Sequence, residues 1–228
     1  HPNVAIRVNN LGGVLRDLGD FQGARAAFER ALAIDDAVYG PDHPTVARDV
    51  NNLGSVLQDL GDLAGARAAI ERALAIWQAV YGDEHPQVAT AHNNLGGVLQ
   101  DLGDLEGARE RYERALAIME KAYGADHPNV ATAVSNLGSV LQDLGDLEGA
   151  RERYERALAI DEKAYGPEHP EVATDVSNLG SLLQELGQKE EACRCFERAL
   201  AIRLKFLGED HPDTKLVRTK LEALDESG

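Results

Sequence analysis

The sequence predicts an all-α fold in which helical hairpins of equal length stack one upon another. The first observation is a fixed period, because a His-Pro dipeptide recurs every 42 residues. The second is that apolar residues within each period follow two helical stripes separated by a glycine-containing turn. Periods of about 20 to 50 residues are typical of repeat proteins, whose units bury their apolar faces against their neighbours. The predicted units, in a single array over 1–228, are 1–42, 43–84, 85–126, 127–168 and 169–210, with a capping helix at 211–228.

The first helix of each unit is predicted from a proline start and an apolar stripe. Proline suits the first helical position, and the residue before it disfavours the α conformation, so Pro44 begins the helix of the second unit. Apolar residues then recur three and four apart over about 17 residues, as on one side of an amphipathic helix. Gly61 can adopt the left-handed cap, and Asp62 can cap the next helix. The stripe consists of Val46, Val50, Leu53, Leu57 and Leu60.

The second helix of this unit is predicted to run from about Leu63 to Tyr81, with Gly82 as its left-handed end. Its apolar positions also follow the helical period. They are Leu63, Ala66, Ile70, Ala73, Leu74 and Trp77.

A glycine recurs in the middle of each first helix, where it costs up to about 1 kcal/mol relative to alanine. We therefore expect the partner helix to approach too closely for a Cβ atom, with a small residue facing the glycine. The glycines are Gly12, Gly54, Gly96, Gly138 and Gly180, and the small residues are Ala24, Ala66, Ala108, Ala150 and Ala192.

The two ends of the array differ. The tail at 211–228 provides one further amphipathic helix, with Glu222 in the place of the packing glycine, as expected of a helix that covers the last apolar face. Its apolar residues are Leu216, Val217, Leu221 and Leu224. The first unit has no comparable cap over Val4, Val8 and Leu11, and Ile6 adds an apolar residue on another side of that helix. The chain starts at His1 without an initiator methionine, which suggests a fragment of a larger protein.

The second unit resembles the tetratricopeptide repeat, because its residues match the signature of that family in order. The matching residues are Leu53, Gly54, Leu57, Gly61, Ala66, Ile70 and Ala73. It departs from the usual 34-residue signature because Val50 (His92 in the next unit) replaces a Trp, Leu replaces a Tyr, and the closing Pro is missing. The 42-residue length, with Asn-Asn-Leu-Gly and a Gly-x-x-His-Pro loop, is similar to the variant in kinesin light chains and in bacterial repeat arrays. The resemblance implies a right-handed superhelical α-solenoid whose first helices line a concave groove.

Composition restricts the kinds of partner. The formal net charge of −16 opposes binding to nucleic acid or to anionic lipid, which both need clustered Lys and Arg. It favours a basic or polar protein partner. No apolar run approaches the roughly 20 residues of a membrane span, and no secretory signal is visible, so we expect a cytoplasmic protein. Cys193 and Cys195 should point in different directions on one helix and remain reduced thiols.

No arrangement of residues indicates catalysis, a metal or a cofactor. Six of the seven histidines start helices and would be about 10 Å apart in stacked repeats, which is too far for one metal. His92 breaks the period but stands on the buried stripe, which favours a core histidine over a functional one. The serines lack a matching histidine, and the glycine strings lack the strand and lysine of a phosphate loop. We therefore predict a protein that is not an enzyme.

Opposite the apolar stripe, the first helices carry three polar rows in which equivalent residues recur. They are an amide row (Asn52, Asn94, Asn136 and Asn178), a Gln row (Gln58, Gln100, Gln142 and Gln184) and an acidic row (Asp59, Asp101, Asp143 and Glu185). Amides can bond to the main chain of an extended peptide, and the carboxylates would attract Lys or Arg in it. Basic groove residues are few, namely Arg16 and Arg48, which disfavours acidic peptides. The alternative is that the rows only join neighbouring helices or form a solvated face. The predicted partner-binding residues are Asn9, Asn10, Arg48, Asn51, Asn52, Gln58, Asp59, Asn93, Asn94, Gln100, Asp101, Ser135, Asn136, Gln142, Asp143, Ser177, Asn178, Gln184 and Glu185.

A second hypothesis is a self-associating array, because the uncovered first helix could meet another end and form a homo-oligomer. Residues 105–118 and 147–160 are identical, which fits either a recent duplication or a consensus-like design.

Overall fold

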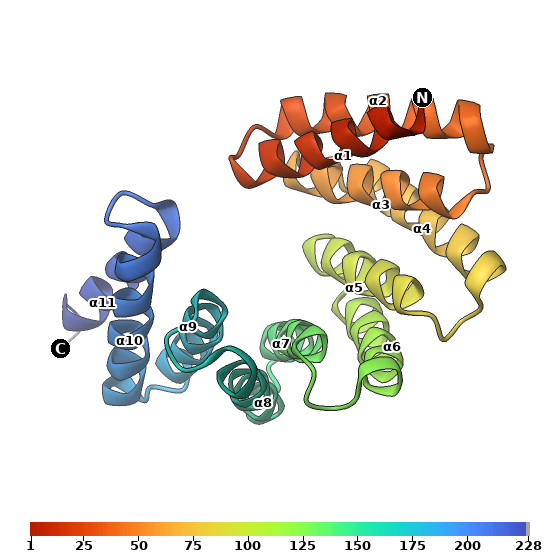
Figure 1. Ribbon diagram of the computed structural model, residues 1–228. Coiled ribbons are helices and arrows are strands. Elements are labelled where there is room, and N and C mark those ends of the chain that lie inside the picture. The colour runs from red at the N-terminus through yellow and green to blue at the C-terminus, as the bar shows by residue number, and fades with distance from the viewer. Residues whose placement is uncertain (227–228) are drawn as a thin grey trace. The chain divides into compact units, whose positions relative to one another are not determined.

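The computed structural model describes residues 1–226, and within this range it contains eleven α-helices and no strand (Figure 1). The predicted all-α fold of five hairpins and one further helix is confirmed. The second helix of the second unit has the predicted bounds, and its first helix is one residue shorter than the estimated 17. The helices are α1 (Pro2–Asp17), α2 (Phe21–Tyr39), α3 (Pro44–Asp59), α4 (Leu63–Tyr81), α5 (Pro86–Asp101), α6 (Leu105–Tyr123), α7 (Pro128–Asp143), α8 (Leu147–Tyr165), α9 (Pro170–Glu185), α10 (Lys189–Leu207) and α11 (Pro212–Glu226).

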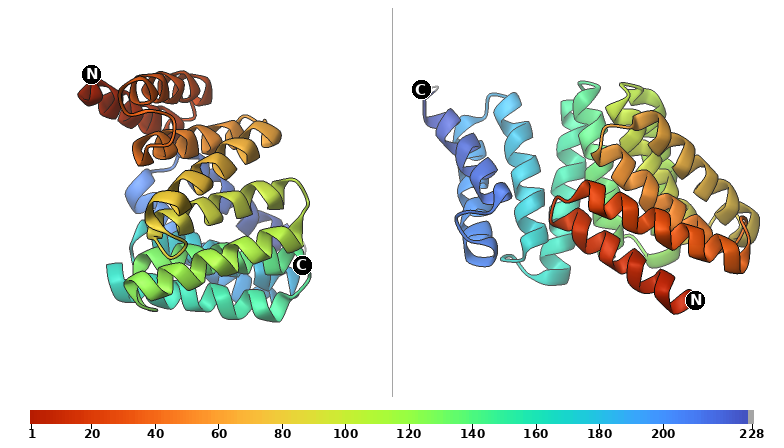
Figure 2. Two further views of the ribbon diagram at one scale, coloured as in Figure 1. Left: turned by 90° about the vertical axis from the view of Figure 1, so that its right-hand side faces the viewer. Right: turned by 90° about the horizontal axis from the view of Figure 1, so that it is seen from above.

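The contacts group the chain into two compact units, His1–Ile118 and Met119–Gly228. In the first unit α1 packs on α2, α2 on α3, α3 on α4 and α4 on α5. In the second unit the same holds from α7 to α11. Helices α1 and α2, for example, lie side by side in all views (Figures 1 and 2). This consecutive pairing is what a solenoid of helical hairpins requires.

The histidine of each His-Pro pair begins a helix through its side chain as well as its position. His43 Nδ1 accepts a hydrogen bond from the Thr45 amide at 3.2 Å, and its ring stacks on Tyr39 with centroids 4.5 Å apart. The same stack recurs at Tyr81–His85, Tyr123–His127 and Tyr165–His169. The predicted roles in helix starting and loop packing are confirmed, although the cap by Nδ1 was not foreseen. An accepting Nδ1 is unprotonated, so the imidazole that caps is neutral.

The predicted turn chemistry is also confirmed. Gly61 and Gly82 have φ values of +80° and +82°, in the left-handed region that favours glycine. Asp62 caps α4 by accepting from the Gly65 amide at 3.0 Å.

The core is aliphatic and rich in alanine, as expected. Val46 and Val50 of the α3 stripe are buried, and so is Ala66 of α4. A Cβ atom on Gly54 would lie 2.6 Å from Ile70 Cγ1 and 3.2 Å from the Ala66 carbonyl oxygen. The close approach is therefore confirmed, but the nearest group is the large side chain at the place of Ile70 rather than the alanine. The equivalent residues are Phe28, Tyr112, Tyr154 and Phe196.

Adjacent glycines in α1 allow a direct test of this packing. A Cβ on Gly12 would lie 2.7 Å from Phe28 Cε1, whereas a Cβ on Gly13 would meet nothing within 4 Å. We expect Gly12→Ala to lower the free energy of unfolding by about 1–3 kcal/mol through overpacking. Gly13→Ala should raise it by up to about 1 kcal/mol, because alanine favours the helix. Urea unfolding of both variants measures this, and equal effects at the two positions would contradict the packing role of Gly12.

His92 is a core histidine, as the sequence suggested, with an exposed fraction of 5%. Desolvation, and then the nearby Arg111 and Arg114, lower its pKa to about 4. The side chain is therefore neutral at pH 7.

The ends of the array are only partly as predicted. On α1, Val4, Ile6 and Leu11 are exposed, whereas Val8 is half-buried. On α11, Val217 and Leu224 are buried and Leu221 is half-buried, so the helix covers α10. Leu216 does not contribute to this cover, because 54% of it is exposed.

Candidate functional site: the polar rows

The amide row joins first helices of neighbouring hairpins within each of the two units. Asn52 Nδ2 donates to Asn9 Oδ1 at 3.0 Å, and Asn94 Nδ2 donates to Asn51 Oδ1 at the same distance. In the second unit, Asn178 Nδ2 donates to Ser135 Oγ at 3.3 Å. One amide of each pair is thus committed to a neighbouring helix.

Two predicted site residues are not displayed on the surface. Asn51 is 4% exposed and Ser177 is 6% exposed. The helical wheel placed both on the polar side, but a helix has neighbours on more than one side, and both positions are covered in the packed array. The expectation that Asn51 and Ser177 are displayed for a partner is therefore corrected. Asn51 instead serves as an acceptor between α3 and α5.

The Gln row joins first helices to the acidic row. Gln58 Nε2 donates to Asp101 Oδ2 at 2.6 Å, and Gln142 Nε2 donates to Glu185 Oε2 at 2.6 Å. Arg16 stands in the Gln position of the first hairpin and forms an ion pair with Asp59. The three contacts have the same spacing of 43 residues, which the 42-residue period produces when each residue reaches one place further in the next unit.

Buried tyrosines orient two of these glutamines. Tyr112 donates its hydroxyl to Gln100 Oε1 at 3.1 Å, and Tyr154 donates to Gln142 Oε1 at 3.2 Å. With its oxygen occupied, the Gln142 amide directs its nitrogen toward Glu185. Burial raises the pKa of Tyr154 to about 12, so it remains a donor at neutral pH.

The polar rows are acidic overall. Asp101 and Glu185 accept from neutral amides and so retain their negative charge. Both basic residues that the sequence placed near this face are neutralised, Arg16 by Asp59 and Arg48 by Asp49 and Asp35. Asp59, Asp101, Asp143 and Glu185 are all exposed. A cation would be attracted to Asp101 and Glu185 more than to Asp59.

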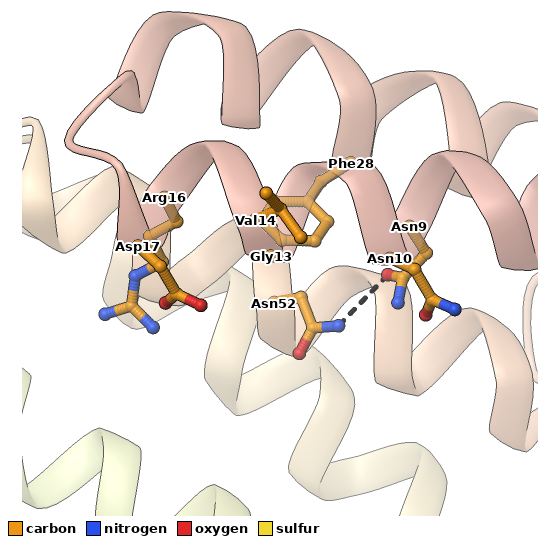
Figure 3. A pocket seen from close by; sticks show the side chains of 8 residues that line it. All are labelled: Asn9, Asn10, Gly13, Val14, Arg16, Asp17, Phe28 and Asn52. Carbon is orange, nitrogen blue, oxygen red and sulfur yellow. Dashed lines mark hydrogen bonds between the residues drawn. The ribbon is translucent and has the colours of Figure 1, made fainter.

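A cavity of about 390 Å³ opens beside the polar rows in the first unit (Figure 3). Figure 3 shows the Asn52 amide directed at Asn9, with the Phe28 ring behind Gly13 and Val14. Three predicted site residues thus line one cavity. Its lining residues are Asn9, Asn10, Gly13, Val14, Arg16, Asp17, Phe28 and Asn52.

The rows therefore hold neighbouring helices together, which is the alternative that the sequence left open, and they also leave groups exposed. The half-buried and exposed members of the rows remain partly accessible to solvent. A role in binding a partner stays a prediction for these residues. The exposed members are Asn10, Asp59, Asp101, Asp143, Gln184 and Glu185.

The structure also contains two buried carboxyl pairs that the sequence reasoning missed. Asp35 of α2 and Asp49 of α3 are 1% and 0% exposed, and Asp161 of α8 and Asp175 of α9 are 7% and 4% exposed. Both pairs occupy the same places in the repeat, where other units have Trp77 or Met119 opposite an alanine. Aligning the five units would have revealed acidic residues at otherwise apolar positions.

Metal-ligating clusters and membrane-spanning helices are both absent from the described part of the chain. Within it, no cluster of three or more His, Cys, Asp or Glu side chains could hold a metal ion. None of the described helices is long and apolar enough to cross a bilayer. Cys193 and Cys195 are both free thiols.

Comparison with known proteins identifies the repeat. Two family profiles, both described as tetratricopeptide repeat, match the chain: one at 4–49, 48–121, 87–163 and 129–192, the other at 176–213. A search of curated proteins found no match.

Solved structures with the same architecture include kinesin light chain-like repeats. The nearly identical TPR-like repeats of a kinesin light chain-like protein from Podosopora anserina are 26% identical, with a TM-score of 0.69, covering 91% of this chain and 98% of theirs. BtubC (BKLC) from P. vanneervenii is 27% identical, with a TM-score of 0.73, covering 92% of this chain and 84% of its own. With family profiles matching from residue 4 to residue 213, the chain belongs to the tetratricopeptide repeat family and resembles its kinesin light chain-like members.

Proposed function

We propose that this protein is a non-enzymatic interaction scaffold that binds an extended basic or polar peptide segment on its polar rows. Tetratricopeptide repeats generally serve as protein–protein interaction scaffolds. The observation that carries the finer proposal is the charge of the rows. Asp101 and Glu185 are exposed, keep their negative charge and are held in place by glutamine donors, while Arg16 and Arg48 are neutralised.

The held carboxylates favour binding for a physical reason. A carboxylate whose position is fixed by a neutral donor loses little conformational entropy when a cation arrives. An extended peptide can also place its main-chain groups against the remaining amide atoms of the Asn and Gln residues. Basic side chains in the peptide would then pair with the acidic row, which would steer association and make it sensitive to salt.

The test is a titration of the isotopically labelled protein with extended peptide libraries of basic, neutral and acidic composition. Basic peptides should shift the resonances of the polar rows. Asp101→Lys should lower the affinity for these peptides by about tenfold or more, since it replaces attraction by repulsion. Asp101→Asn should give an intermediate loss. Asp36→Lys, an equal charge change at an exposed position of α2, is the matched control and should have little effect. Spectra unchanged by every library would contradict the proposal.

A second candidate function is self-association through α1. The observation that favours it is the apolar surface of this helix, where Leu11, Val14 and Leu18 are 52%, 55% and 77% exposed. A contact between this surface and another copy would bury it. Sedimentation at increasing protein concentration should then show a rising mass that Leu11→Glu abolishes, and a constant monomer mass would contradict self-association.

A further inference from the structure

The Asp161–Asp175 pair lies at the contact of α8 with α9, the two helices on either side of the fifth His-Pro turn. The two carboxyl groups share a hydrogen bond. Their other oxygens, Asp161 Oδ1 and Asp175 Oδ2, are buried and have no hydrogen-bond partner. Leaving a buried polar atom unsatisfied costs about 1–3 kcal/mol, and more for a charged group. The equivalent atoms Asp35 Oδ1 and Asp49 Oδ2 are also buried without a partner, so the two pairs differ in the cation beside them rather than in these atoms.

The equivalent place between α2 and α3 contains an arginine. Arg48 Nη2 lies 2.8 Å from Asp49 Oδ1 and 3.4 Å from Asp35 Oδ2, so one guanidinium spans the pair. Between α10 and α11 an arginine, Arg203, stands in the sequence place of Asp161 itself. There Arg203 donates to the Asp213 carbonyl at 3.0 Å and lies 3.7 Å from its carboxylate. A guanidinium thus faces the acidic groups at both of these helix contacts, although only Arg48 spans a pair of carboxyls.

The α8–α9 contact has more acid and no such cation. Thr174, which is exposed, stands where α3 has Arg48. Glu171, also exposed, adds a third carboxylate one turn before Asp175. None of the ion pairs found among the described residues gives Asp161, Asp175 or Glu171 a basic partner. His169 lies nearby, but its Nδ1 accepts from the Glu171 amide at 3.3 Å, which requires a neutral ring.

We propose that Asp161, Asp175 and Glu171 form a binding site for an arginine side chain of a partner protein. The guanidinium approaches over Thr174 and takes the place that Arg48 fills between α2 and α3. A planar fork of donors can bridge two carboxylates, whereas a lysine ammonium acts as a point charge, so arginine is the preferred occupant. The site uses other side chains than the three polar rows, so its failure would leave the proposed peptide binding untouched.

Proton linkage gives this site a recognisable signature. Burial, and then the neighbouring Asp161, raise the pKa of Asp175 to about 8, and burial also raises the pKa of Asp161. The titratable groups that face the pair are Glu171 and His169 at the start of α9. A guanidinium favours the form in which both carboxyls are ionised, so binding releases the shared proton to solvent. Its apparent affinity should rise about tenfold per pH unit below about pH 8 and level off above it.

The probe for the test is the capped tripeptide acetyl-Gly-Arg-Gly-amide, added to the full chain while the aspartate carboxyl carbons are followed by NMR. We expect a saturable shift of the Asp175 resonance at pH 8 and a pKa lowered by at least one unit at saturation. The citrulline tripeptide, a neutral isostere, should cause no shift, and the lysine tripeptide should bind more weakly. An arginine tripeptide that leaves the resonance and the pKa of Asp175 unchanged would overturn the proposal.

Matched variants locate the site. Thr174→Arg should lower the pKa of Asp175 without any peptide and abolish the response to the tripeptide, because the internal guanidinium occupies the site. Thr132→Arg is the control, since it places an arginine at the same position of α7 next to Ala133, where there is no carboxylate. A response that survives in Thr174→Arg would count against the site. The response should persist in Asp101→Lys, which separates this site from the polar rows.

Discussion

The double variant Asp161→Met and Asp175→Ala is expected to be more stable than the natural protein by about 2 kcal/mol at pH 7. The replacement pair already exists in the chain, because Met119 and Ala133 occupy the equivalent places, and Ala133 is 3% exposed. Well-packed apolar residues need no compensation for lost hydration, whereas buried carboxyl groups without a cation do.

The effect of pH on this variant follows from the direction of the pKa shift. Asp175 has a pKa of about 8 in the folded protein against 3.8 when exposed, so the folded state binds more protons between these values. The carboxyl pair therefore destabilises the fold least below about pH 4. The free energy of unfolding of the unsubstituted protein falls as the pH rises toward 8. The advantage of the double variant should grow from pH 5 to pH 8.5.

Urea unfolding followed by circular dichroism at several pH values measures this difference. Hydrogen exchange of α8 and α9 should show that the gain is local, since repeat arrays can open in parts. Glu152→Ala, at an exposed position of α8, is the control and should change little at any pH. An advantage that does not depend on pH would mean that the carboxyl pair is not the cause.

The scaffold was predictable because every unit repeats the same local sequence features. The apolar spacing of Val46 and Val50, the left-handed glycines and the cap at Asp62 each depend on local geometry that five copies repeat. The mid-helix glycines also predicted a close approach, but not which side chain would lie against them. That depends on the rotamer of residues such as Ile70 and Phe28, which spacing alone does not determine.

The site was less predictable because polar residues were assigned to the surface by type. Asp49 stands three residues after Val46 and one before Val50, which places it beside the buried stripe, yet its charge suggested a solvated position. Asn51 was misplaced for a related reason, since the wheel of one helix does not show the adjacent hairpin. The hydrogen bonds between successive units depend on how the hairpins stack, so only the structure could show which amides are already committed.

Arg48→Met should have the opposite effect to the double variant and destabilise the protein at pH 7. Arg48 was a predicted partner-binding residue, but its guanidinium pairs with Asp49 and Asp35. Removing it leaves two buried carboxyl groups without a cation, which typically costs about 3–5 kcal/mol for a fully buried pair. We expect about 2 kcal/mol, because more than a third of the Arg48 side chain is exposed and its charge is partly screened.

The pH dependence distinguishes this structural role from a role in binding. Burial raises the pKa of Asp49 to about 6 even though Arg48 opposes the shift, so without Arg48 the pKa should rise further. A carboxyl with a raised pKa weakens the fold as the pH increases, and the deficit of Arg48→Met should therefore shrink toward pH 4. Arg25→Met is the control, since it removes only the exposed pair with Glu29 and should change the free energy of unfolding little. If Arg48 serves only to contact a partner, its loss will leave urea unfolding unchanged at every pH and weaken peptide binding alone.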